Sequence, residues 1–203
     1  MGFSEGRTME QAYIDDRIEV LTNMVYVIPK MVNEKIKSLD DNYKKTAKDS
    51  ADGDKEIELD YYNQLSGFNP FEEFNYHFYV SFVITIYAFY EKTLRKLFEK
   101  YKILLLKNKR DSYAIQFFNS IKKHIENSNL SLNPVVCKLS SVIDKDHREL
   151  RNDLTHNKTD VDITLFRNGE YLIEFLDNVK TILLDVNTKL EQAEKTNKKR
   201  NIK

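Results

Sequence analysis

One stripe of apolar side chains constrains the fold of this chain more than any other feature. Apolar or aromatic residues recur every three or four positions near the start of the chain: Ile14, Ile18, Leu21, Val25, Ile28, Val32, Ile36, Leu39 and Tyr43. That spacing puts all of them on one face of a long α-helix. Pro29 lies inside the stripe and is expected to kink the helix or to split it in two, because proline removes a backbone donor and clashes with the preceding turn.

The scarcity of turn-forming residues excludes most all-β folds. The 203 residues include only 5 Gly and 3 Pro, whereas sheets need many tight turns. Hydrophobic residues make up 41% of the chain, which is enough for a core. We therefore predict an all-α, antiparallel bundle of about five helices. An N-terminal helical extension, residues 1–66, is expected to pack on a helical core formed by residues 67–203.

Two Asn-Pro pairs, at 69–70 and 133–134, predict helix starts, because Asn caps a helix and Pro suits its first position. The first helix should reach about Lys107 and hold the aromatic run 78–90. The second should end near His156.

Three further stripes of apolar residues are predicted to face the core. They are Ala114, Phe117, Phe118, Ile121 and Ile125; Val136, Leu139, Ile143, Leu150 and Leu154; and Leu172, Phe175, Val179, Ile182, Val186 and Leu190.

The connections are predicted from their polarity and turn residues. The polar stretch 44–60 has an Asp-Gly-Asp sequence at its centre, and we predict that it forms a mobile loop. Residues 161–166 could form a short strand of a hairpin with Asn168-Gly169 as the turn, or an extended connection before the last helix. The basic tail from Lys195 onward is expected to fray.

Composition excludes several classes of protein. The longest apolar run has 13 residues (78–90), short of the ~20 that span a bilayer, so a buried helix is favoured over a membrane segment. Residues 1–11 lack the apolar core of a signal peptide. One cysteine, Cys137, excludes an intrachain disulfide and suits a reducing, cytoplasmic compartment. Zinc-ligand spacings and nucleotide-binding loops are missing, so neither a metal nor a cofactor is expected.

The segment 151–156, with the sequence Arg-Asn-Asp-Leu-Thr-His, carries the clearest chemical pattern. The guanidinium of Arg151 fits a phosphate, and His156 can transfer protons near neutral pH. Asn152 lies four residues before His156, so the two share a helix face and Asn152 could orient the ring. Arg151 and His156 are about 140° apart on an ideal helix. They converge only if the helix loosens or if a second copy brings its own motif alongside.

Each of these residues also has a purely structural interpretation. Arg151 could pair with Asp153 or Glu149, and His156 could be an ordinary polar residue near a helix end. Basic clusters along 92–100 and 107–110 could hold an RNA backbone, but acidic residues interleave with some of them. Equal totals of 32 basic and 32 acidic residues give no global attraction for nucleic acid.

The motif and its flanks resemble the HEPN family (higher eukaryotes and prokaryotes nucleotide-binding), a class of small all-α bundles. The family signature is an arginine and a histidine, four to six residues apart on a late helix, with a polar residue after the arginine. An acidic residue on an earlier, aromatic-rich helix often accompanies it, and Glu91 follows the aromatic run here. Glu91 would then orient Arg151 or His156. The alternative for Glu91 is an exposed ion pair with Arg95.

What the resemblance implies is a metal-independent endoribonuclease that acts as a homodimer with a composite cleft. Such proteins often serve as toxins held by an antitoxin, or in phage defence. Some members only bind RNA or a partner protein, so the fold does not guarantee the activity. Two other interpretations therefore stay open: a non-catalytic binding module, and a scaffold in which the motif is only a helix end.

Overall fold

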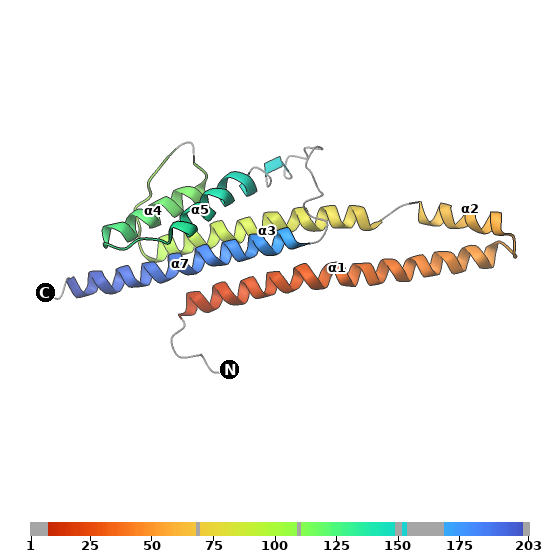
Figure 1. The fold of residues 1–203 in the computed structure, drawn as a ribbon, viewed down its shortest axis with the longest axis horizontal. Helices are drawn as coiled ribbons and strands as arrows, with labels where there is room; N and C mark the ends of the chain where they lie inside the picture. The colour runs from red at the N-terminus through yellow and green to blue at the C-terminus, as the bar shows by residue number, and fades with distance from the viewer. Residues whose placement is uncertain (1–7, 68–69, 109–110, 149–151, 154–168, 201–203) are drawn as a thin grey trace.

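A computed structural model describes residues 8–67, 70–108, 111–148, 152–153 and 169–200, and every regular element within these ranges is helical (Figure 1). The elements are α1 (Met9–Ser50), α2 (Lys55–Ser66), α3 (Pro70–Lys100), α4 (Tyr113–Asn127), α5 (Pro134–Val142), the π-helix η1 (Ile143–His147) and α7 (Glu170–Arg200). The predicted all-α bundle is confirmed. The strand considered at 161–166 lies outside the described residues.

The central helix of the bundle is α7, which packs against α1, α3, α4 and α5. Figure 1 shows α3 and α7 as a middle layer, with α1 on one side and α4 and α5 on the other. Lys100 at the end of α3 reaches Glu10 at the start of α1, so these two helices are antiparallel. The predicted stripe of the last helix is fully buried: Leu172, Phe175, Val179, Ile182, Val186 and Leu190.

Helix α1 is a single 42-residue helix that contains Pro29, so of the two predicted effects of this proline, a kink or a split, the split does not occur. Its first half delivers Ile14, Ile18, Leu21 and Val25 into the common core. Proline at position 29 removes one intrahelical hydrogen bond, but the packing on both sides of it keeps the helix continuous. The first half of α1 is thus one of the helices that form the bundle core.

The predicted mobile loop at 44–60 is also wrong. Helix α1 continues to Ser50, a short turn follows, and α2 returns along α1 as a helical hairpin. Asp54 caps α2, accepting hydrogen bonds from the backbone of Glu56 at 2.9 Å and Ile57 at 3.3 Å. Ala47 is fully buried in α1. Figure 1 shows this hairpin extending beyond the rest of the bundle.

Helix α3 ends at Lys100, earlier than the predicted Lys107. Lys102 takes a left-handed conformation with a φ of 50°. Its amide donates to the carbonyl of Glu99, and the amide of Ile103 donates to the carbonyl of Phe98. This pair of bonds is a Schellman motif, which usually has glycine at the left-handed position. A lysine there gives no sequence signal, which explains the error.

Helix α5 begins at Pro134, as the second Asn-Pro pair predicts. The predicted face of α4 is buried, and Asn133 caps α5 by accepting from Val135 N at 2.9 Å. The π-helical turn of η1 was not predicted. Helix α7 continues to Arg200, so the tail predicted to fray from Lys195 is helical to that point. Within the described ranges no helix has the length and apolarity that crossing a membrane requires.

Candidate functional site

The structure describes only part of the predicted site. Arg151 and His156 lie outside the described residues. Asn152 is helical and half-buried, and Glu91 is half-buried on α3. The structure therefore does not test whether these side chains converge. What it does describe is the scaffold that leads into the motif.

A buried hydrogen bond fixes the helix before the motif to α3. The hydroxyl of Tyr90 on α3 lies 2.9 Å from Oγ of Ser140 on α5, and either atom can donate. Both residues are buried, and burial raises the pKa of Tyr90 far above its usual range, so this phenol stays neutral. Since Glu91 is the next residue after Tyr90, this bond joins α5 to the turn of α3 that carries Glu91.

A second anchor holds the start of α5 on α7. The backbone amide of Asn133 donates to Oδ2 of Asp185 at 3.0 Å. Asn133 itself caps α5, so one residue both starts the helix and attaches it to the central helix of the bundle. The two ends of α5 are thereby fixed against different neighbours.

The π-helix η1 lies directly between α5 and the motif segment. A π-helical turn holds about one more residue than an α-helical turn, so Ile143–His147 depart from the regular helical spacing of α5. Asp144 in η1 accepts a hydrogen bond from the Ser112 hydroxyl at the start of α4, and Arg148 lies 3.8 Å from the same carboxylate. Short π-helical segments are often found at functional sites. No sequence signal predicts this turn.

Arg95, the ion-pair partner considered for Glu91, has a different direct partner. Arg95 Nε lies 2.8 Å from Oε1 of Glu99, one turn further along α3. The hydrogen bond and charge of Glu99 raise the pKa of Arg95, and the charge of Glu91 adds a smaller effect in the same direction. The Glu91 carboxylate thus interacts electrostatically with Arg95, whose direct ion-pair partner is Glu99.

The basic cluster on α3 is largely engaged within the protein. Lys100 Nζ lies 2.6 Å from Oε1 of Glu10, and Lys96 Nζ lies 4.6 Å from the centre of the Tyr13 ring. Both partners belong to α1. These cations help to hold α1 on α3, so RNA would have to compete with partners already in place.

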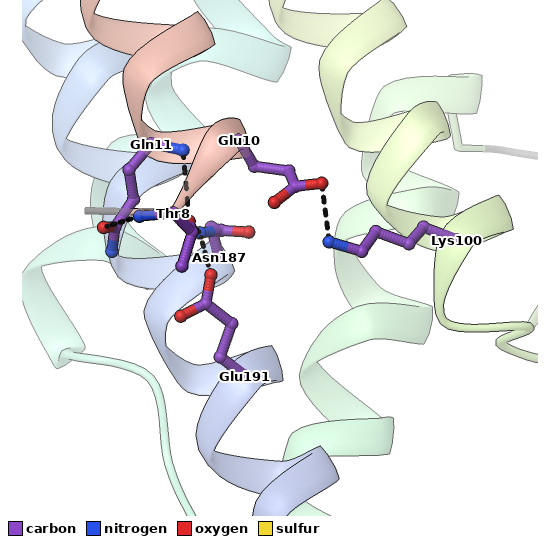
Figure 2. Close-up of polar contacts among 6 residues, drawn as sticks. All are labelled: Thr8, Glu10, Gln11, Lys100, Asn187 and Glu191. Carbon is purple, nitrogen blue, oxygen red and sulfur yellow. Dashed lines mark hydrogen bonds and ion pairs between the residues drawn. The ribbon is translucent and has the colours of Figure 1, made fainter. Parts of the chain in front are cut away.

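A polar cluster that sequence analysis missed lies where α1, α3 and α7 meet (Figure 2). Asn187 is fully buried on α7, and its Nδ2 donates to Oε1 of Glu191 at 2.8 Å and to Oγ1 of Thr8 at 3.4 Å. Thr8 caps α1 together with Gln11 in a reciprocal capping box. Within the described residues, Oδ1 of Asn187 has no hydrogen-bond partner.

The nearby Tyr101 is held neutral. Burial raises its pKa to about 12, with further increases from the negative charges of Glu191, Glu194 and Glu10. The hydrogen bonds of Thr8 with Gln11 and Asn187 therefore fix the start of α1 on α7. The cluster does not present a reactive group.

Comparison with protein-family profiles, with curated proteins and with solved structures finds no match to this chain.

Proposed function

We propose that this protein is a metal-independent endoribonuclease of the HEPN type, with Arg151 and His156 as its catalytic residues. The observation that carries the proposal is the Arg-Asn-Asp-Leu-Thr-His segment at 151–156, on the late part of a helical bundle and after an aromatic-rich helix. The π-helical turn just before the segment is consistent with a functional site.

The proposed reaction is an internal transesterification of RNA. The ribose 2′-oxygen attacks phosphorus, the bond from phosphorus to the 5′-oxygen breaks, and a 2′,3′-cyclic phosphate forms. His156 either takes the proton from the 2′-hydroxyl while water protonates the leaving 5′-oxygen, or protonates the 5′-oxygen while water takes the 2′-hydroxyl proton. Arg151 binds the phosphate and stabilises the negative charge that develops there.

Two further residues take supporting roles in this proposal. Asn152 orients the His156 ring or binds a phosphate oxygen. Glu91 orients the arginine, from the turn of α3 that the Tyr90–Ser140 bond attaches to α5. A second copy of the chain would complete a composite cleft. A role as a toxin controlled by an antitoxin, or in phage defence, is part of the same proposal.

The test is RNA cleavage in EDTA by the wild type, by His156→Ala and by a matched control, His124→Ala. His124 is half-buried on α4 and belongs to no proposed site. We expect cleavage by the wild type and the control, with cyclic phosphate ends, and a loss of at least about a hundredfold in His156→Ala. Equal cleavage by a folded His156→Ala protein would contradict the assignment.

A second candidate is a non-catalytic module that binds RNA or a partner protein. It is favoured by the large apolar side chains exposed on α1 and α2, among them Met31, Leu59 and Tyr61. Stable binding of RNA or of a partner by a folded wild type that cleaves no RNA would favour this candidate over the nuclease.

A further inference from the structure

Helix α1 carries a second apolar stripe on its outer side, which we call the outer stripe. Its members are Val20, Met24, Val27 and Met31, and their exposed fractions lie between 39% and 62%. The spacings of four, three and four residues match the a and d positions of a coiled coil. The outer stripe lies about 120° around the helix from the buried stripe of Ile14, Ile18, Leu21 and Val25.

The outer stripe is suited to a partner helix. A continuous apolar row on a surface helix is a feature of interaction sites. The exposed Arg17 ends the row toward the start of α1. Tyr13, one turn earlier, lies beneath Lys96 and 6.3 Å from the Phe89 ring. The apolar row therefore consists of the four exposed residues from Val20 to Met31, and α3 contacts α1 beyond its first end.

The charges along α1 indicate what the partner is. Residues 9–22 include four acidic residues and one basic residue, but Glu10 pairs with Lys100 of α3 and Asp15 pairs with Lys180 of α7. The remaining Asp16, Arg17 and Glu19 leave this half a net charge of −1. Residues 23–37 include three basic residues and one acidic residue, a net charge of +2. A helix with one acidic and one basic half is complementary to an antiparallel copy of itself, whereas a parallel copy would place like charges together.

The residues beside the outer stripe agree with this arrangement. Asp16, Asn23, Lys30 and Lys37 are spaced by seven residues, so they line one edge of the stripe, and all are exposed. In an antiparallel pair with a two-fold axis near Asn23, the edge residue Asp16 faces Lys30 of the second copy. The same register places Met24 against Val20 of that copy.

We propose that α1 of a second copy of this chain docks antiparallel along the outer stripe. The contact is isologous, so each copy supplies the same residues. It does not rest on the proposed nuclease. Figure 1 places α1 on the side of the bundle opposite α4 and α5, so this interface differs from any that involves α5 and η1.

The apolar part of the interface is tested by sedimentation of Val20→Glu/Val27→Glu beside a matched control, Tyr26→Glu. Tyr26 is 62% exposed on the same helix but lies off the stripe. Glutamate has a higher helix propensity than valine, so the double variant should keep α1 intact, as circular dichroism can check. We expect the assembly mass to fall by half in the double variant and to be unchanged in the control.

The charge pattern is tested with a reversal and its compensation. Asp16→Lys introduces two like-charge contacts per dimer and should weaken self-association about tenfold. Asp16→Lys/Lys30→Asp exchanges the charges and should restore it. The proposal is overturned by a wild type that stays monomeric at all concentrations. It is equally overturned if the assembly keeps its mass in Val20→Glu/Val27→Glu, or if Asp16→Lys does not weaken self-association. RNA cleavage is not a readout of either experiment.

Discussion

At the scale of single residues, the hydrogen bond of Tyr90 with Ser140 makes the clearest prediction about stability. Its ring is fully buried and its hydroxyl meets Ser140 between α3 and α5. Tyr90→Phe removes one partner and leaves the serine hydroxyl buried, which should cost about 1–2 kcal/mol of unfolding free energy. Urea titration measures the change, and Tyr113→Phe, at a tyrosine that is 66% exposed, is the control.

The same bond has a second consequence that a double-mutant cycle reveals. Ser140→Ala in the Tyr90→Phe background removes both polar partners, so its additional cost should be smaller than that of Ser140→Ala alone. Equal costs in the two backgrounds would show that the two side chains do not stabilise each other.

Lys102 is the residue whose replacement should raise stability. Its φ of 50° is left-handed, a conformation that costs an ordinary L-residue about 1–2 kcal/mol and glycine much less. Lys102→Gly should therefore stabilise the protein by roughly 0.5–1 kcal/mol after the entropy of glycine in the unfolded chain is included. Asn129→Gly is the comparison, because Asn129 has a φ of 58° and asparagine tolerates it. A larger gain at Asn129 than at Lys102 would argue against this account.

At the scale of elements, Pro29 tests how α1 stays continuous. Alanine at position 29 can donate a hydrogen bond to the carbonyl of Val25 and has a high helix propensity. We expect Pro29→Ala to raise the free energy of unfolding by about 1–3 kcal/mol, measured by thermal and urea denaturation. A loss of stability would mean that α1 depends on a bend at this proline.

The elements also show what the sequence could predict and why. Helix faces followed from apolar spacing, because each buried stripe faces the common core, as in α4 and α7. Helix ends failed where tertiary contacts decide them: the stretch around Ala47 is polar, yet α1 continues through it because α2 packs there.

The candidate site follows the same division between local and long-range information. The motif of Arg151 and His156 is a local pattern, so it could be recognised from the sequence alone. The Tyr90–Ser140 bond joins residues 50 positions apart, and η1 depends on Asp144 meeting Ser112. Pairings of this kind depend on how the helices pack, which apolar spacing does not encode.

At the scale of the whole molecule, the hairpin of α2 and the second half of α1 differs from the rest. The first half of α1 is buried against the bundle, whereas α2 has no buried residue among its 12. A segment with so little buried surface should open locally at a lower free energy than the core. We therefore expect amide hydrogen exchange to be faster in α2 and in the end of α1 than in α7.

One substitution can separate the opening of this hairpin from global unfolding. Ala47 is fully buried in the half of α1 that pairs with α2, and leucine there would overpack the contact. Ala47→Leu should speed exchange in α2 and leave α7 protected, while Ala88→Leu, at an exposed position of α3, should change neither. Because α1 is one continuous helix, the exchange rates along it also show how far the local destabilisation extends from Ala47. If α7 lost protection together with α2, the hairpin and the bundle would have to unfold as one cooperative unit.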